Sequence, residues 1–124
     1  MPLLITSVLF GLLHIWNPEI DKLGIHLIWY YIGTGLFLGL ITLMDEGMEL
    51  ALGFHAANNL VTALLVTASW TAFQTESLLI DNSEPSLGME LIITLAVIYP
   101  LLALIFAKKY QWKNWITQLT HKFE

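Results

Sequence analysis

Four long runs of apolar residues, separated by short polar stretches, dominate the chain. The runs cover residues 2–16, 25–44, 50–70 and 88–107. The last three are close to the roughly 20 apolar residues that an α-helix needs to cross the hydrocarbon core of a bilayer. The first is short for a span and is typical of a helix whose beginning is missing. The pattern therefore predicts an all-α, polytopic bundle of about four transmembrane helices with no β-sheet.

The connectors and the C-terminal tail predict where these helices end. Helices usually stop at or before the residue that precedes a proline, so Pro18 should end the first run. The tail 108–124 is amphipathic, with Trp112, Trp115 and Leu119 at helical spacing and lysines nearby. Aromatic and basic residues in this arrangement are typical of a helix that lies in the membrane interface. We therefore expect the tail to be a cytoplasmic, interfacial anchor.

Composition also indicates a membrane protein. Of the 124 residues, 56% are hydrophobic and only 12% are charged, whereas soluble domains are about 45–50% apolar and about 25% charged. A soluble domain this apolar would have too little polar surface to cover itself. The length suits one membrane domain, 1–124. The absence of cysteine excludes disulfides and thiolate metal sites. The chain has a net charge of −5 and no basic patch, so we expect no nucleic-acid partner. The expected partner is membrane lipid.

The distribution of lysine predicts the orientation of the chain, which has no arginine. Four of the five lysines follow the last apolar run, namely Lys108, Lys109, Lys113 and Lys122. Because short loops rich in lysine and arginine stay in the cytoplasm, the C-terminus should be cytoplasmic. The loop 74–86 is then outside, as is Lys22, which is the exception to the rule. We expect a multi-pass integral protein of the bacterial plasma membrane.

Among the polar side chains within the apolar runs, where such groups are costly, His14, His55 and Asn59 are the site candidates. His14 is near the end of the first run, and His55 and Asn59 lie four residues apart in the third, so they share one helix face. Ionisable groups in membrane segments usually face a bundle interior or an aqueous cavity. The alternative is that each only hydrogen-bonds a neighbouring helix. His26 opens the second run near the interface and His121 lies in the tail, so neither is a site candidate.

A site shared by these three residues would suit hydrolysis. Neutral imidazoles bind zinc or act as general bases, and an asparagine amide can donate to a developing oxyanion. Hydrolysis also needs a group that activates water, usually a carboxylate. No carboxylate lies in an apolar run beside these groups. The residues alone therefore predict a polar intramembrane site with one component missing.

Residues 10–14 form the pattern FxxxH, and residues 55–59 form HxxxN. In this order, on separate membrane helices, the two motifs resemble those of the CPBP family, the CAAX prenyl endopeptidases and bacteriocin-processing proteases that are also called the Abi family. The resemblance covers about residues 3–70. It implies an intramembrane metalloprotease-type hydrolase in which His14, His55 and Asn59 are catalytic. It further implies one of two arrangements. Either His14 and His55 are ligands of zinc or another divalent metal, or the motif glutamate and one histidine form an acid–base pair while the second histidine and Asn59 donate to the oxyanion.

One family motif is not found in these 124 residues. Members carry EExxxR upstream of FxxxH, and its glutamate is implied to activate water, but the chain has no arginine and no adjacent glutamates. We expect the C-terminal part of an endopeptidase that cleaves a membrane-associated peptide or protein and is incomplete as this chain. The alternatives are a non-catalytic membrane immunity or scaffold protein of the same fold, and a transporter fragment with His14 and His55 on a proton path.

The two motifs pose a geometric problem. The first and third runs should cross the membrane in the same direction, yet His14 lies near the end of one and His55 near the start of the other. The imidazoles can meet if the helices are short and tilted, or if the connectors dip into a polar cavity. We expect both imidazoles to share a cavity with Asn59.

Two neighbours of HxxxN extend this prediction. Asn58 is one position off the face of His55 and Asn59, so it should point toward a neighbouring helix. Gly53 should let another backbone approach just before His55, because small residues permit close helix packing in membranes.

Overall fold

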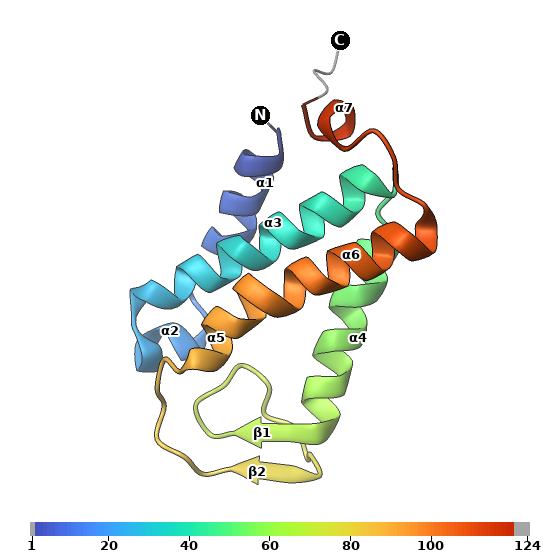
Figure 1. Ribbon diagram of the computed structural model, residues 1–124. Helices are drawn as coiled ribbons and strands as arrows, with labels where there is room; N and C mark the ends of the chain where they lie inside the picture. Colours follow the sequence, from blue (N-terminus) through green and yellow to red (C-terminus); the bar gives the residue numbers. More distant parts are fainter. Residues whose placement is uncertain (1, 121–124) are drawn as a thin grey trace.

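The computed structural model describes residues 2–120, which are mainly helical (Figure 1). The predicted tail positions His121 and Lys122 lie outside the described residues. In chain order the elements are α1 (Pro2–Leu12), α2 (Pro18–Leu23), a short 3₁₀ turn η1 (Ile25–Leu27), α3 (Ile28–Met44), α4 (Glu49–Leu65), β1 (Val66–Ala68), β2 (Leu79–Asp81), α5 (Met89–Ile93), a π-helical segment η2 (Thr94–Ile98), α6 (Tyr99–Tyr110) and α7 (Trp115–Thr120).

Two continuous helices in the described residues are long and apolar enough to cross a membrane. They are Ile25–Met44, with 20 residues, and Met89–Tyr110, with 22. Only 11% of the apolar window of the second is buried within the chain, so its surface requires an apolar surrounding. By contrast, α1 has 11 residues and α4 has 17. The all-α class is therefore confirmed, whereas only two of the four predicted spans reach membrane length.

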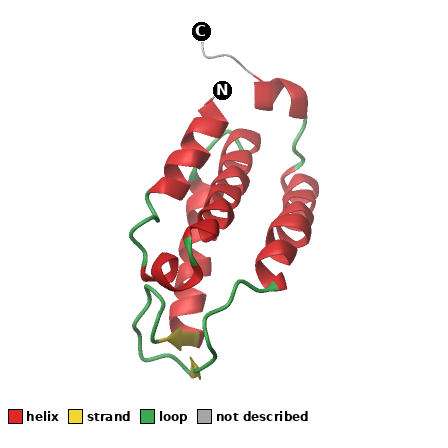
Figure 2. Ribbon diagram, turned by 90° about the vertical axis from the view of Figure 1, so that its left-hand side faces the viewer, coloured by secondary structure: helices red, strands yellow, loops and turns green. Residues whose placement is uncertain are grey.

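The helices form an open bundle with the strands at one end (Figures 1 and 2). α1 and α3 run antiparallel, α6 lies alongside α3, and α4 runs from beyond the end of α3 past α6 to β1. The core joins α3, α4 and α6 through Phe37, Ile41, Ala51 and Ala103. Phe37 also stacks on Tyr99, with ring centroids 4.3 Å apart. This core holds α4 against the α1–α3 hairpin that carries FxxxH.

The third predicted helix, 50–70, ends early, and the prediction of no β-sheet is wrong there. Helix α4 ends at Leu65, and β1 then pairs in parallel with β2. The last-turn carbonyls of α4 accept hydrogen bonds from the following loop: the Ser77 hydroxyl donates to Ala63 O at 2.7 Å, and the Leu78 N–H donates to Leu64 O at 3.0 Å. Because these bonds replace a further helical turn, Val66 is free to be extended.

The first predicted helix, 2–16, also ends early, at Leu12. Residues 13–16 form turns, and the N–H of Asn17 donates to His14 O at 3.0 Å. Pro18 then occupies the first turn of α2, where its missing N–H costs nothing. The shortening matters for the site, because it places His14 in a turn below α1 rather than on a straight span.

The tail does not form one amphipathic helix in the described residues. The helix α6 continues to Tyr110, and the left-handed residues Gln111 and Asn114, with φ of 56° and 55°, break the chain before α7. The spacing predicted that Trp112 and Trp115 share one helix, and in the structure they do not. The Trp112 indole N–H instead donates to Asp45 Oδ1 at 3.2 Å, which ties the tail to the α3–α4 turn.

Candidate functional site

A small polar cavity lies where α1, α2, α3, α4 and α6 meet the loop after β1. Its volume is about 150 Å³. The lining residues are Phe10, His14, Asn17, Glu19, Tyr30, Tyr31, Thr34, His55, Asn58, Asn59, Ala72, Phe73 and Tyr99. All three residues that the sequence predicts for the site are among them. The predicted convergence of the two histidines is thus found in the structure, while their chemical roles stay predictions.

The phenylalanine of FxxxH brings the two imidazoles together. The ring centroid of Phe10 lies 4.7 Å from that of His14 and 5.6 Å from that of His55, the latter in an edge-on arrangement. The connectors that carry Glu19 and Phe73 line the same cavity. Two predicted features therefore let the imidazoles meet: α1 is short, and the connectors help to line the cavity.

The hydrogen bond of His14 defines which of its ring nitrogens can act. Its Nδ1 lies 2.7 Å from the carbonyl oxygen of Phe10, so Nδ1 carries the proton and donates. In the neutral imidazole the lone pair is then on Nε2. The ring stacks on Tyr31, with centroids 4.4 Å apart, and the Asn17 amide donates to the Tyr31 hydroxyl at 3.4 Å. These contacts hold the imidazole in one orientation.

The HxxxN pair acts as a unit on α4. The Asn59 amide nitrogen lies 3.3 Å from His55 Nε2, as the spacing of four residues predicts for one helix face. Since the amide N–H donates, Nε2 holds the lone pair of the neutral imidazole and Nδ1 carries its proton. An asparagine amide has two N–H groups, so one remains for a ligand. The pair thus keeps two donors, the Nδ1–H of His55 and the second N–H of Asn59.

Two predictions about the neighbours of this pair are wrong. Asn58 lines the same cavity instead of pointing toward a neighbouring helix. A Cβ added at Gly53 would meet nothing within 4 Å, so no backbone among the described residues approaches there. The two outcomes have one cause. Ala56 and Ala57 are exposed, so no other helix among the described residues packs on this side of α4. His26 is exposed at the start of the second span and takes no part in the cavity, as expected.

Sequence reasoning missed one residue, Glu19. Its Oε1 accepts a hydrogen bond from the N–H of Ala72 at 2.8 Å, across 53 positions of sequence. Its Oε2 is buried and has no hydrogen-bond partner within residues 2–120. Glu19 lies outside the apolar runs, in the connector after Pro18, so the predicted set of intramembrane polar groups does not include it. The sequence signal for Glu19 is its position directly after Pro18, which ends the segment that carries FxxxH.

The residues that the structure describes bring together the two metal ligands that the resemblance implied, His14 and His55, at one cavity. In the part of the chain that the structure describes, no three His, Asp or Glu side chains lie close enough together to hold a metal ion. A zinc site generally uses three or four protein ligands. The lone pair of His55 Nε2 is also already occupied by Asn59. Zinc at His14 and His55 would need a further ligand, and the metal dependence of the activity stays a prediction.

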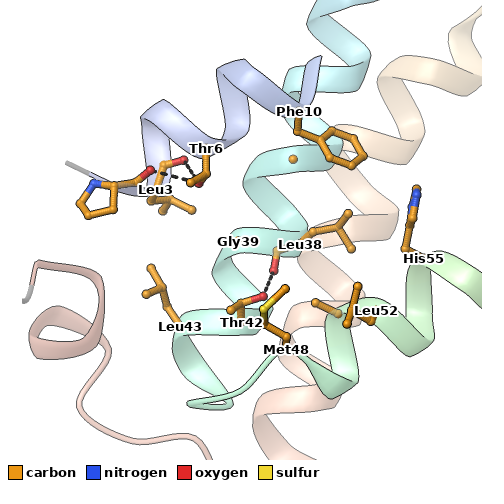
Figure 3. Close-up of a pocket in the computed structure, with 13 residues that line it drawn as sticks. Leu3, Thr6, Phe10, Leu38, Gly39, Thr42, Leu43, Met48, Leu52 and His55 are labelled. Atoms are coloured by element: carbon orange, nitrogen blue, oxygen red, sulfur yellow. Dashed lines mark hydrogen bonds between the residues drawn. The ribbon is translucent and has the colours of Figure 1, made fainter. Parts of the chain in front are cut away.

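An apolar groove adjoins the polar cavity. It has a volume of about 410 Å³ and runs between α1, α3 and α4 (Figure 3). Leu3, Leu38, Leu43, Met48 and Leu52 are among its lining residues. Phe10 and His55 line both the groove and the cavity, so the groove reaches His55. The site therefore combines a polar centre with an apolar approach.

Comparison with known proteins agrees with the two motifs. Residues 1–61, which contain both FxxxH and HxxxN, match the family described as Rce1-like, type II CAAX prenyl endopeptidase. The uncharacterised protein YyaK of Bacillus subtilis (strain 168) is 34% identical over 64 residues, which are 52% of this chain and 21% of that protein. The match thus spans about a fifth of that relative's length. No solved structure matches the chain. Together with the two apolar helices, the matched segment 1–61 indicates an integral membrane protein, and over that segment, just under half of its length, the chain matches the Rce1-like family of type II CAAX prenyl endopeptidases.

Proposed function

We propose that this chain carries the hydrolytic centre of an intramembrane endopeptidase that cleaves a membrane-associated peptide or protein. The observation that carries the proposal is the meeting of His14, His55 and Asn59 at one cavity, beside an apolar groove that also has His55 in its lining. Polar side chains that only hydrogen-bond neighbouring helices do not need to line the same cavity. The convergence therefore favours a shared site over the alternative that each polar side chain only hydrogen-bonds a neighbouring helix.

The hydrogen bonds suggest a role for each side chain. The lone pair on His14 Nε2 can accept a hydrogen bond from a water molecule and orient it. The Nδ1–H of His55 and the second N–H of Asn59 can donate to the carbonyl oxygen of the scissile bond, where negative charge develops as water attacks. Donors that are already in place lower the barrier because they need no reorganisation during the reaction. The removal of a proton from the water requires a further base.

The groove indicates the class of substrate. Its lining is almost entirely apolar, and at about 410 Å³ it can accept an extended hydrocarbon chain. A lipidated peptide could place its chain there while its peptide bond lies at His55. The family description makes a prenylated peptide that ends in a CAAX sequence the first substrate to test.

The decisive experiment is a cleavage assay in proteoliposomes with a fluorogenic farnesylated CAAX peptide. The protein as encoded by its gene is compared with His14→Ala, His55→Ala and Asn59→Ala at matched protein levels. We expect both histidine variants to lose nearly all activity and Asn59→Ala to lose most of it.

The controls are His26→Ala and His121→Ala, which we expect to be near neutral, because His26 is exposed away from the cavity. Activity that survives in His55→Ala would refute the proposed role of the site. A protein without any peptidase activity, but with intact folding, would favour the non-catalytic alternative. Proton-coupled uptake into the vesicles that depends on His14 and His55 would favour the transporter alternative.

A further inference from the structure

Three hydroxyl side chains lie on the wall of the polar cavity, on helices that carry neither histidine. Tyr30 and Thr34 belong to α3, Tyr99 begins α6, and all three line the cavity. Tyr99 lies in the last apolar helix, outside the matched segment 1–61, and neither FxxxH nor HxxxN includes any of the three. The two motifs therefore assign these hydroxyls no part in the site.

Packing fixes the ring of Tyr99. The ring stacks on Phe37, with centroids 4.3 Å apart and planes 5° apart, and meets the ring of Phe54 edge-on at 6.4 Å. The π-helical segment η2 (Thr94–Ile98) comes directly before Tyr99. Such segments are rare within α-helices and are frequently found at functional sites. The hydroxyl of Tyr99 is thus held at one place on the cavity wall.

The hydrogen bonds among these side chains run in one direction. The Thr34 hydroxyl donates its single proton to the carbonyl oxygen of Tyr30 at 3.0 Å. The Thr34 oxygen lies 3.2 Å from the Tyr99 hydroxyl, so Tyr99 is the donor in this second bond. The Tyr30 hydroxyl lies beside that of Tyr99 and can approach it only as a further donor. The Tyr99 oxygen therefore offers the cavity a lone pair and no proton.

A peptide group that enters the cavity needs an acceptor as well as donors. The cavity volume of about 150 Å³ equals that of about five liquid waters, which is room for little more than one peptide group. In the proposed function His55 and Asn59, both on α4, donate to its carbonyl oxygen. The N–H of a trans peptide points away from the C=O, so its acceptor must come from another element. A buried N–H without an acceptor is costly.

We propose that Tyr99 is a substrate-binding residue whose hydroxyl oxygen accepts a hydrogen bond from the N–H of the scissile peptide bond. This inference rests on the proposed function. The bond turns the scissile carbonyl toward the donors on α4. Hydrogen bonds then run from the substrate through Tyr99 and Thr34 to the Tyr30 carbonyl, and each member of such a chain polarises the next. The last apolar helix thereby takes part in the site.

Tyr99→Phe removes the hydroxyl and keeps the ring that stacks on Phe37. Cleavage in proteoliposomes is measured for the farnesylated CAAX peptide and for the same peptide with an ester in place of the scissile amide, which has no N–H. We expect kcat/KM for the amide to fall about tenfold, as for a buried N–H that loses its acceptor, and kcat/KM for the ester to change less than about twofold. Tyr110→Phe, at an exposed position of the same helix, is the matched control and should leave both values unchanged.

The ratio of amide to ester cleavage separates substrate binding from a structural role. An equal fall for both substrates in Tyr99→Phe would overturn the proposal, because it would reflect only the lost bond between α6 and Thr34. An unchanged amide rate would also overturn it, and an amide-specific fall in Tyr30→Phe alone would make Tyr30 the acceptor instead. If His55→Ala stays active, or the unmodified protein cleaves neither peptide, the proposed function itself fails and the role of Tyr99 fails with it. If His55→Ala is inactive while Tyr99→Phe keeps the normal ratio, only the role of Tyr99 is wrong.

Discussion

At the residue scale, hydrogen bonds assign complementary roles to two chemically identical side chains. The Nδ1–H of His14 is bound to the Phe10 carbonyl, which leaves a lone pair at Nε2. His55 has the opposite arrangement, because Nε2 accepts from Asn59 and Nδ1 carries the proton. One imidazole is thus suited to accept and the other to donate. The assignment depends on the orientation of the Asn59 amide, which makes that residue the most informative one to change.

Asn59→Ala and Asn59→Asp should both reduce kcat, by about 100- to 1000-fold, which is the usual cost of removing one oxyanion donor. The alanine removes the donor. The aspartate replaces it with an acceptor and draws the proton of His55 to Nε2, which reverses the arrangement. Single-turnover rates on the lipidated peptide would measure the effect. An active Asn59→Asp protein would contradict the assigned tautomer of His55.

The groove gives a second prediction at this scale. Leu52 lines the groove, whereas Leu60 lies two turns further along α4 and lines neither pocket of the site. The two leucines are similarly exposed, at 57% and 60%. Leu52→Asn should raise KM for the farnesylated peptide about tenfold, because burial of an apolar side chain is worth about 1.5–3 kcal/mol. Leu60→Asn should leave KM unchanged. Equal effects of the two substitutions would show that the groove does not bind the lipid.

At the element scale, the contact between α1 and α3 places FxxxH. A Cβ at Gly35 would lie 3.0 Å from the Cα and the carbonyl oxygen of Ser7 and 3.1 Å from Cβ of Phe10. Two of these are backbone atoms, which cannot yield without a movement of α1. The side chain of Ser7 is almost fully buried and its hydroxyl donates to Leu3 O at 2.6 Å. The glycine therefore allows α1 to come close enough for Phe10 to reach His55.

Gly35→Ala should push α1 away from α3 and cost about 1–3 kcal/mol of stability, as overpacking of a close contact does. Because Phe10 and His14 move with α1, activity should fall as well. Thermal unfolding in detergent and the cleavage assay would measure the two effects.

Gly53→Ala is the matched control, because its Cβ would meet nothing within 4 Å among the described residues and alanine favours helix. We expect it to be tolerated. Equal damage from both substitutions would mean that another segment packs on Gly53.

At the scale of the whole molecule, the predicted orientation assigns opposite sides to the two ends of the bundle. The strands and the loop 74–86 lie at one end, and α7 lies at the other (Figure 1). Helix α6 carries Lys108 and Lys109 in its last turn, and these lysines favour the cytoplasmic side. We therefore propose that α7 faces the cytoplasm and that the strand end, with the nearby cavity, faces the opposite side.

Cysteine labelling tests this orientation directly, because the chain has no cysteine of its own. Single cysteines are introduced by Glu84→Cys and Thr117→Cys, at exposed positions of the two ends. In intact cells a membrane-impermeant maleimide should label the first but not the second. After permeabilisation it should label both. The reverse pattern would show that the C-terminus is outside.

The sequence by itself determined the features that are local along the chain. The apolar runs 25–44 and 88–107 predicted helices that the structure extends over Ile25–Met44 and Met89–Tyr110, because span length depends only on consecutive apolar residues. The contact between His55 and Asn59 follows from their spacing on a single helix. The two motifs likewise indicated the family that segment 1–61 matches.

The tertiary structure decided what depends on contacts between distant segments. Helix α4 ends at Leu65 because Ser77 and Leu78 satisfy its last carbonyls, and no periodicity within 50–70 contains that information. The two histidines meet through the ring of Phe10, which depends on how closely α1 packs on α3. Glu19 is held at the cavity by a hydrogen bond from the N–H of Ala72, which lies 53 residues away in sequence. Helix and strand patterns report local hydrogen bonding and one-sided burial, whereas the site is defined by which segments share a cavity.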